Sequence, residues 1–376
     1  MSRSMTAHLN EFTGDDFKAS VSMYVGMKST KLYCHSTCQQ AKPENSIIFS
    51  SRYEAERLGF RPCQSCFSSL PIGVWRDHNE YMLLKAPEDF RFSVNLRYLN
   101  RSQDECLHKV ENNKVYKVLE LNHTDVLVEV SSWQDRILIV RFVGDTPQKQ
   151  SIRVAAASYV WDWFDLDRNL TPFYQMGRTD PILSQAVLDF RGLRLIGVTD
   201  LFEALCWTII GQQINLPFAY TLKRRFVELS GRHVMWRDQP YWLFPTPEKV
   251  AALSLGTLRS LQFTTRKAEY LIGLAKNMIN GRVSRDTLLL LKGYHEIGEE
   301  LQRIRGIGPW SAHYVLMRHF KDPCAMPIQD VGLQNAVKLA RQMEHKPSKD
   351  ELVELTNGWD SWKAYATFYL WMTLSS

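Results

Sequence analysis

The chain has 376 residues, a length typical of two or three domains, and its hydrophobic content of 45% indicates folded cores. No apolar run approaches the roughly 18 residues of a transmembrane helix, and the polar N-terminal stretch lacks the apolar segment of a signal peptide. The formal net charge of +6 permits a nucleic-acid partner without requiring one. We therefore expect no membrane-spanning segment, while composition alone leaves the function open.

The first region of the chain is marked by its cysteines. Residues 1–20 are polar and are expected to form a flexible leader. Cys34 and Cys38 in YCHSTC, with Cys63 and Cys66 in RPCQSC, then form two close pairs. Four thiolates suit one tetrahedral Zn²⁺, and an odd total of seven cysteines favours a reducing compartment over disulfides. Residues 21–72 are predicted to be a small zinc-binding domain, which at this size needs the metal to fold.

The segment KSTKLYCHSTC…GFRPCQSC resembles the four-cysteine zinc domain of the bacterial Ada family. In that family the first cysteine accepts the methyl group of a DNA methyl phosphotriester, which implies Cys34 as the methyl acceptor. Zinc favours the thiolate form, and the thiolate is the attacking species. A zinc site that only holds the fold or docks DNA is the alternative. Because β-rich sequence replaces the helix-turn-helix region usual in that family, a transcription-activator role is disfavoured.

The next region carries strand signals and gives way to helix signals. Alternating apolar runs at residues 115–121, 126–130 and 137–142, separated by polar turn residues, predict an antiparallel sheet. From about residue 152 helix signals dominate, among them Thr246 as an N-cap with Pro247 at the first helical position. We predict a β-rich domain over residues 80–172 and a mostly helical domain over 173–376. The fold class is α+β and multidomain.

Residues 301–312, LQRIRGIGPWSA, place two glycines and a proline between segments of helical periodicity. Since a helix interior disfavours these residues, the pattern predicts a helix, a tight turn at Gly306 and Gly308, and a second helix. The exposed amide groups of such a turn, together with the positive end of the second helix, form an anion site suited to a DNA phosphate. On spacing alone, an ordinary helix–helix loop explains the glycines equally well.

Asp330 opens an apparent amphipathic helix in PIQDVGLQNAV, 22 residues after Gly308. Asp is a preferred N-cap, which by itself explains the residue. The hairpin pattern resembles the helix-hairpin-helix motif of DNA repair proteins, and an Asp at this distance is the layout of the helix-hairpin-helix DNA glycosylases. That resemblance implies that Asp330 is catalytic, because its charge stabilises the oxocarbenium-like transition state while a flipped base departs.

Further strings, among them LFEALCWTIIGQQIN, WLFPTPEKVAAL and WDSWKAYATFYLW, resemble the 3-methyladenine DNA glycosylase II (AlkA-like) family over residues 85–376. The resemblance implies a base pocket walled by Trp310, Tyr314 and Trp371. Electron-rich rings suit N3- or N7-alkylated purines, which carry positive charge. It also places Gln212 and Gln213 at the intercalation point, although the wedge of the best-known members is apolar.

The resemblance also sets expectations about reaction and partners. Trp310 stands where lyase relatives carry a catalytic lysine, and an indole cannot form a Schiff base, so a monofunctional glycosylase that leaves an abasic site is expected. No cysteine follows Cys324, so no Fe–S cluster is expected. The expected partner is double-stranded DNA containing alkylated bases, bound by a monomer at the nucleoid of a bacterial cytoplasm. A methylation-responsive DNA-binding regulator and a non-catalytic DNA-binding repair factor are the alternatives.

Overall fold

The computed structural model describes residues 5–9, 24–35, 38, 41, 45–49, 55, 58, 60–63, 74–147 and 149–374. Cys66 and most of the predicted leader lie outside the described residues. Among the described residues, no helix combines the length and the apolar character needed to cross a membrane.

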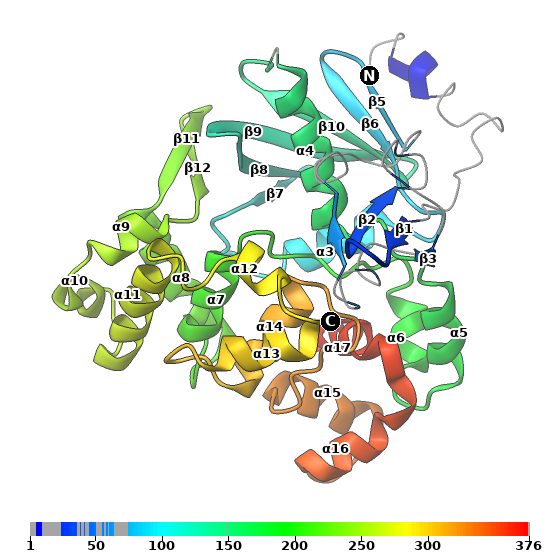
Figure 1. Ribbon diagram of the computed structural model, residues 1–376, viewed down its shortest axis with the longest axis vertical. Helices are drawn as coiled ribbons and strands as arrows, with labels where there is room; N and C mark the ends of the chain where they lie inside the picture. The colour runs from blue at the N-terminus through cyan, green and yellow to red at the C-terminus, as the bar shows by residue number, and fades with distance from the viewer. Residues whose placement is uncertain are drawn as a thin grey trace.

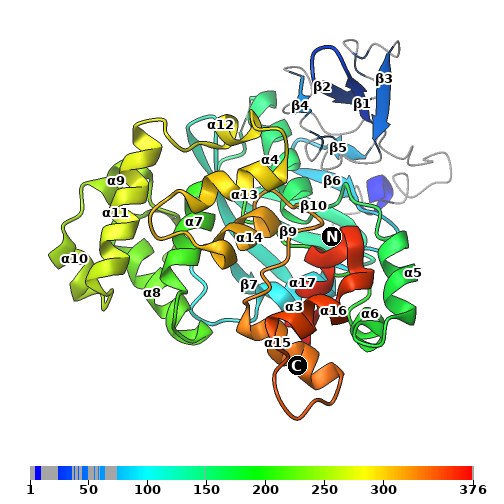
Figure 2. The same ribbon diagram turned by 60° about the horizontal axis from the view of Figure 1, so that its bottom comes forward.

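The N-terminal module is a small sheet with its own core. Strands β1 (Tyr24–Met27), β2 (Leu32–His35), β3 (Ser46–Phe49) and β4 (Arg61–Pro62) pair in the order β3-β1-β2-β4. Its buried cluster consists of Tyr24, Tyr33, Phe49, Ala55 and Phe60. Figure 2 shows this sheet at the edge of the molecule. The Tyr24 hydroxyl donates to Asp167 Oδ2 at 2.9 Å and so links the module to the rest of the chain.

Part of the predicted leader is held in place. Residues 5–9 are helical, and the side chains of Met5 and Leu9 are buried against a group of sheet residues: Tyr81, Leu83, Ile137 and Ile139. The expectation of flexibility rested on polarity alone and did not include this contact.

The central sheet is antiparallel and has six strands. Their order is β5-β6-β10-β9-β8-β7, and their bounds are β5 Trp75–Asp77, β6 Tyr81–Lys85, β7 Lys109–Glu111, β8 Lys114–Leu121, β9 Thr124–Trp133 and β10 Ile137–Val143. The three alternating runs of the sequence are the strands β8, β9 and β10, so the predicted antiparallel sheet is confirmed. Helix α3 (Phe92–Leu99) follows β6, and α4 (Gln150–Trp163) packs Ile152, Ala156 and Val160 into the core.

Helices make up most of the chain after the sheet, as predicted (Figure 1). They are α5 (Thr171–Thr179), α6 (Ser184–Asp189), α7 (Leu201–Ile210), α8 (Leu216–Ser230), α9 (Pro247–Ala251), α10 (Leu255–Ser260), α11 (Thr265–Ile279), α12 (Arg285–Leu289), α13 (Tyr294–Gln302), α14 (Pro309–Arg318), α15 (Val331–Ala340), α16 (Lys349–Leu355), the 3-10 helix η1 (Asn357–Trp362) and α17 (Lys363–Thr373). Thr246 is the N-cap residue of α9 as predicted, but its side chain makes no capping hydrogen bond.

The sheet and the helices share one continuous core. Leu84, Val128 and Val140 of the sheet belong to the same buried cluster as Phe202 of α7 and Val315 of α14. Burial of apolar surface on both sides of the predicted boundary at residues 172–173 therefore stabilises the two parts jointly.

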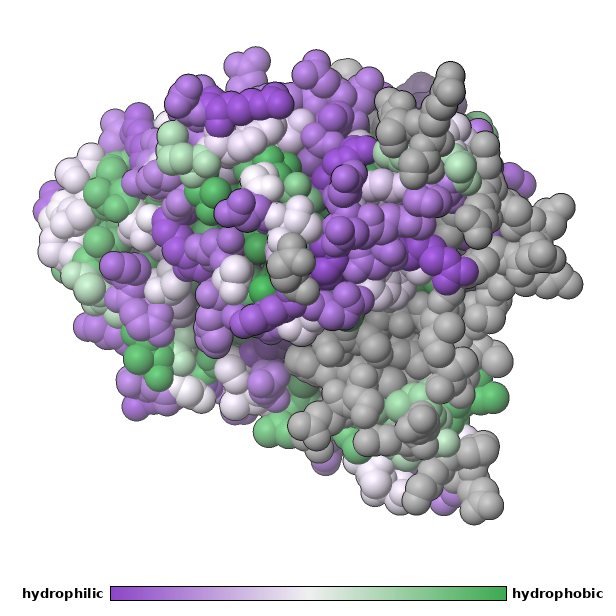
Figure 3. All heavy atoms as spheres, turned by 90° about the horizontal axis from the view of Figure 1, so that it is seen from above, coloured by the Kyte–Doolittle hydropathy of each residue, from purple (hydrophilic) through white to green (hydrophobic). Residues whose placement is uncertain are grey.

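A hairpin that we did not predict interrupts the helical part. Strands β11 (Arg232–Trp236) and β12 (Gln239–Leu243) pair antiparallel, and Tyr241 packs against Tyr116, Val118 and Leu127 of the central sheet. Seen from above, the coloured surface of the molecule is mainly hydrophilic, with hydrophobic side chains in small patches (Figure 3).

Candidate active site

A cleft of about 910 Å³ opens between the helices. The α7–α8 loop, the starts of α14 and α15 and the end of α17 contribute to its walls. Most of the predicted site residues line it: Gln212, Gln213, Gly308, Trp310, Tyr314, Asp330 and Trp371. Segments far apart in the sequence thus meet at one cavity of a size that suits an organic ligand.

Asp330 is held in this cleft by three N–H donors. It is the N-cap residue of α15, and its Oδ1 accepts a hydrogen bond from the Leu333 amide at 2.7 Å. Trp371 Nε1 lies 2.9 Å from the same oxygen, and Trp310 Nε1 lies 2.9 Å from Oδ2. Hydrogen bonds to an ionised acceptor are stronger than neutral ones. Asp330 therefore caps α15, and the three donors also fix both of its carboxylate oxygens in the cleft.

Gly332 leaves the space that this arrangement needs. A Cβ at position 332 would lie 2.9 Å from Asp330 Oδ1 and 3.4 Å from the Trp371 ring. Any larger residue must displace the carboxylate or the indole. Sequence analysis did not single out Gly332, because a glycine in the first turn of a helix has no distinctive local pattern.

The three predicted aromatic residues form a row along one wall of the cleft. The ring centroids of Trp310 and Tyr314 are 5.6 Å apart, and those of Tyr314 and Trp371 are 6.1 Å apart. Trp310 and Tyr314 share a face of α14 because they are four residues apart. Burial raises the pKa of Tyr314 to about 12 although the charge of Arg318 opposes the shift, so the phenol stays neutral and its ring lines the wall.

The hairpin between α13 and α14 is the predicted helix, turn and helix. Gly306 has φ +97°, and a Cβ there would lie 2.5 Å from the Tyr270 ring, so both conformation and packing require glycine. A Cβ at Gly308 would meet no atom within 4 Å. Within the described part of the chain, the amides of Gly308, Trp310 and Ser311 find no acceptor. These donors surround the N-terminus of α14, where a helix favours an anion.

Three family models match successive parts of the chain. The model for the HhH-GPD superfamily base excision DNA repair proteins matches residues 206–361. The N-terminal domain of 8-oxoguanine DNA glycosylase matches residues 82–205, and the metal-binding domain of Ada matches residues 9–68. A relative from Bacillus subtilis, DNA-3-methyladenine glycosylase, is 44% identical over 302 residues, which are 80% of this chain and 99% of that protein. The chain belongs to the DNA-3-methyladenine glycosylase family.

Two further matches have lower sequence identity. DNA-3-methyladenine glycosylase 2 of Escherichia coli is 30% identical over 183 residues, which are 48% of this chain and 61% of that protein. The solved structure of the 3-methyladenine DNA glycosylase from Archaeoglobus fulgidus has a TM-score of 0.68 at 21% identity, covering 77% of this chain and 97% of the other. This likeness confirms the fold class, in which a sheet precedes the helical hairpin domain.

The wall of the cleft also contains residues that sequence analysis missed. Trp207, Tyr98 and Arg101 line it. Arg101 donates to the Tyr220 hydroxyl through Nε at 2.8 Å and Nη2 at 2.6 Å, and its guanidinium lies 3.8 Å from the centre of the Tyr98 ring. Tyr98 and Arg101 come from the sheet part of the chain, so no local spacing relates them to the hairpin. For Trp207 a signal existed, because it stands inside the LFEALCWTII string.

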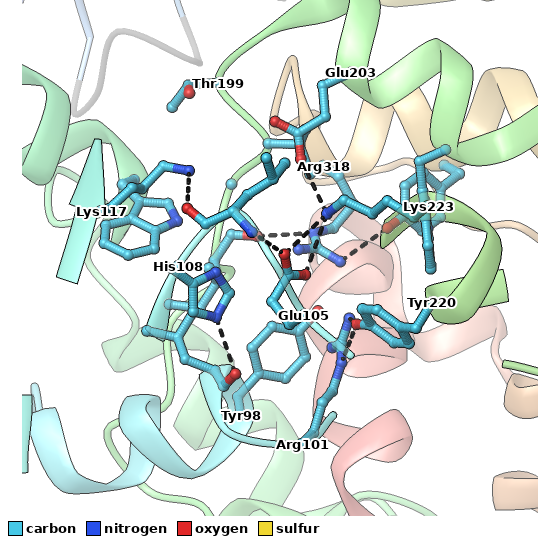
Figure 4. A pocket seen from close by; sticks show the side chains of 18 of the residues that line it. Tyr98, Arg101, Glu105, His108, Lys117, Thr199, Glu203, Tyr220, Lys223 and Arg318 are labelled. Carbon is cyan, nitrogen blue, oxygen red and sulfur yellow. Dashed lines mark hydrogen bonds and ion pairs between the residues drawn. The ribbon is translucent and has the colours of Figure 1, made fainter. Parts of the chain in front are cut away.

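A second cavity of about 60 Å³ shares Tyr314 and Arg318 with the cleft. Lys223 of α8 donates there to Glu105 at 3.1 Å and to Glu203 at 3.4 Å (Figure 4). Burial raises the pKa of Glu105, but the Lys223 charge and further contacts outweigh it and lower the pKa to about 2. Lys223, Glu105 and Glu203 are paired with one another. These ion pairs connect the sheet part of the chain to helices α7 and α8.

The N-terminal module brings three of the predicted zinc ligands together. The sulfur atoms of Cys34, Cys38 and Cys63 all lie within 4.8 Å of one another, and Cys38 Sγ lies 3.8 Å from Cys63 Sγ. Sulfurs bound at about 2.3 Å to one tetrahedral Zn²⁺ are about 3.8 Å apart, whereas a disulfide needs about 2.05 Å. The donor set therefore fits zinc. Cys34 and Cys63 are buried, and Cys38 is half-buried.

Proposed function

We propose that the chain is a monofunctional DNA glycosylase that flips a cationic alkylated purine, of the 3-methyladenine type, into the cleft and removes it in base excision repair. The single observation that carries the proposal is the Asp330 carboxylate, fixed by two indole N–H groups and one amide beside a row of aromatic rings. The family to which the chain belongs supports the same reaction class.

The proposed reaction assigns one task to each group. The hairpin amides near Gly308 hold a backbone phosphate, and Gln213 fills the gap in the base stack. The cationic base stacks against Trp310, Tyr314 and Trp371. Asp330 stabilises the positive charge that develops on the sugar as the bond to the base breaks, and water then attacks the sugar. An alkylated cationic base is a good leaving group, so no second acid is needed.

The residues lining the described cleft support cleavage without strand scission. They include no lysine, and a glycosylase that also nicks the strand needs an amine to form a Schiff base with the opened sugar. The proposal therefore leaves an intact strand with an abasic site. We further propose that the chain acts as a monomer on the DNA of the bacterial cytoplasm.

Replacing the carboxylate by its amide tests the proposal. Asp330→Asn keeps a side chain that can cap α15 but lacks the charge, so release of free methylated base from methylated duplex DNA should be abolished while DNA affinity is retained. Asp200→Asn is the matched control, because Asp200 is likewise an N-cap and accepts from the Glu203 amide outside the cleft.

Three results of this experiment would contradict the proposal. An active Asp330→Asn variant would remove the carboxylate from the mechanism. Strand breaks before alkali treatment would indicate a lyase, and the absence of both base release and breaks with the natural sequence would favour a regulator or a non-catalytic DNA-binding factor.

The Ada-type match over residues 9–68 supports a second proposal, that the module binds one Zn²⁺ through Cys34, Cys38, Cys63 and Cys66 and accepts a methyl group on Cys34. The thiolate would form a bond to the methyl carbon of a phosphotriester while the carbon–oxygen bond breaks and the phosphodiester leaves as an anion. Mass spectrometry of the chain after incubation with methyl phosphotriester DNA should find the methyl group on Cys34. Methylated protein from a Cys34→Ser variant would contradict this assignment.

A further inference from the structure

The loop that carries the two predicted intercalation residues is tied to the hairpin by one of them. Gln212 directs its side-chain amide to the hairpin: Nε2 donates to the Gly306 carbonyl at 2.7 Å and lies 3.5 Å from Ser311 Oγ. Gly306 belongs to the turn, and Ser311 belongs to the first turn of α14. Gln212 therefore bridges the α7–α8 loop to the hairpin between α13 and α14.

A buried cation holds the other end of the same loop. Lys267 of α11 is buried, and its Nζ donates to the Ile210 carbonyl at 2.8 Å, at the C-terminus of α7. A cation at this end of a helix is favourable because the unpaired carbonyls carry partial negative charge. Burial lowers the pKa of Lys267.

Helix α11 also supports the hairpin. The Tyr270 ring lies directly beneath Gly306, so closely that a Cβ there would be 2.5 Å away. Glu269, the residue before Tyr270, pairs through Oε2 with Arg305 Nη2 at 3.0 Å. Helix α11 packs against α7, and α7 packs against α14 (Figure 1). One helix thus fixes both the loop and the turn, and the Gln212 hydrogen bond joins the two directly.

The backbone of Gln213, next to Gln212, has a conformation that residues other than glycine rarely adopt. It is exposed at the mouth of the cleft and has φ +56°. Such a conformation persists only where the surrounding structure holds it. Gln212 is fixed on one side of it, and on the other Asn215 caps α8 by accepting from the Phe218 amide at 2.9 Å.

We propose that Gln212 is a positioning residue that couples the hairpin to insertion of Gln213 into the base stack. Phosphate capture by the hairpin fixes the Gly306 carbonyl, and the Gln212 amide bound to it then holds Gln213 ready to replace the flipped base. Gln212 itself does not enter the stack. This inference rests on the proposed function in that a base is flipped, but it concerns the insertion step and not the cleavage step.

The insertion step can be measured without cleavage. The full chain is mixed with a duplex containing a tetrahydrofuran abasic analogue beside 2-aminopurine, whose fluorescence reports disruption of the stack. Gln212→Leu removes the amide donor. The equilibrium constant for insertion, measured from the fluorescence change, should fall about tenfold, the usual effect of losing one hydrogen bond of this kind. Gln213→Ala should have the same effect, and the double variant should add nothing further because both residues serve one step.

Excision gives the second measurement. Single-turnover removal of 7-methylguanine paired with cytosine should fall about tenfold in Gln212→Leu. When the same base lies opposite an abasic analogue, little pairing must be broken. The excision rate of Gln212→Leu should then be within about twofold of the rate of the protein without the substitution. Gln302→Leu is the matched control, since Gln302 Nε2 also donates to a glycine carbonyl, that of Gly298, at 3.1 Å but does not line the cleft.

Three outcomes would overturn the inference. These are an unchanged fluorescence response in Gln212→Leu, an equal loss of excision from paired and unpaired sites, and full additivity with Gln213→Ala. If the unmodified chain released no base at all, the proposed function would fail, and the fluorescence measurement would still decide the coupling.

Discussion

The indole nitrogen of Trp310 lies 2.9 Å from Oδ2 of Asp330, so a ring that walls the cleft also holds the carboxylate. Trp371 does the same at Oδ1. The orientation of the charge therefore depends on the positions of the two rings against which we propose that the base stacks. A base that fits between the rings leaves the carboxylate aligned, whereas a base that forces a ring aside also moves the charge that we propose stabilises bond cleavage.

Removing one indole donor should separate these two tasks. Trp310→Phe keeps an aromatic wall but leaves Asp330 Oδ2 without its indole hydrogen bond, and we expect the single-turnover excision rate to fall about tenfold. The affinity for product-like abasic DNA should change by less than about twofold. Trp359→Phe is the matched control, because the Trp359 indole also donates to an aspartate, Asp180, at 2.8 Å but does not line the cleft. Equal losses in both variants would refute the orienting role.

Gly332 provides a steric test of the same arrangement. In Gly332→Ala the added methyl group would lie 2.9 Å from Asp330 Oδ1, so the carboxylate must rotate away from Trp371. We expect excision to fall at least about tenfold, since small displacements of a catalytic group are costly, with the melting temperature little changed. Gly256→Ala is the control: Gly256 is also two residues after the N-cap, and its Cβ would lie 3.6 Å from Ser254 Oγ, an ordinary contact. Undiminished excision by Gly332→Ala would refute the steric argument.

The sequence predicts those structural features that depend on residues close together in the chain. Strands β8 to β10 were predictable because apolar alternation is a local property. The hairpin of β11 and β12 was not, because its turn uses Arg237 and Asp238, both with positive φ, where glycine or asparagine is the usual signal.

The site follows the same rule. Asp330 and the aromatic row were expected because they belong to ordered strings that resemble a known family. The indole donors, the space at Gly332 and the approach of Arg101 from the sheet are contacts between distant segments. No residue pattern along the chain encodes such contacts, so only the folded chain reveals them.

The two hairpin glycines should respond differently to alanine. Gly308→Ala adds a methyl group that meets nothing within 4 Å, so stability should be retained. The affinity for undamaged duplex DNA should fall several-fold, because the methyl group would obstruct the backbone phosphate that we propose binds there. Gly306→Ala should lower the free energy of unfolding by about 1–3 kcal/mol, because it forces a side chain into φ +97° against Tyr270. Denaturant unfolding and fluorescence anisotropy measure the two effects. Equal behaviour of both variants would contradict the division of roles.

Acid should weaken the junction between the sheet and the helices. Burial lowers the pKa of His108 to about 4 from its usual 6.5, so the folded state favours the neutral ring. This contribution to stability is complete above pH 6.5 and is lost as the pH falls towards 4. In His108→Gln the free energy of unfolding should depend less on pH over that interval. Urea unfolding at several pH values measures this dependence, and an unchanged slope would show that folding does not lower the pKa of His108.

Removal of zinc should unfold the N-terminal module while leaving the glycosylase core intact, because Tyr24, Tyr33 and Phe60 form a cluster separate from the core shared by sheet and helices. Cys63→Ser should lose the bound metal, measured as zinc per chain, since a structural site needs all of its thiolates. Excision from short methylated duplexes should then stay within about twofold, whereas duplex affinity and its dependence on salt should decrease if the module contacts the phosphate backbone.

Cys206→Ser, at a buried cysteine of α7, controls for a thiol lost outside the module and should retain the zinc. Loss of excision in parallel with zinc would instead mean that the module supports the cleft through its contact with Asp167.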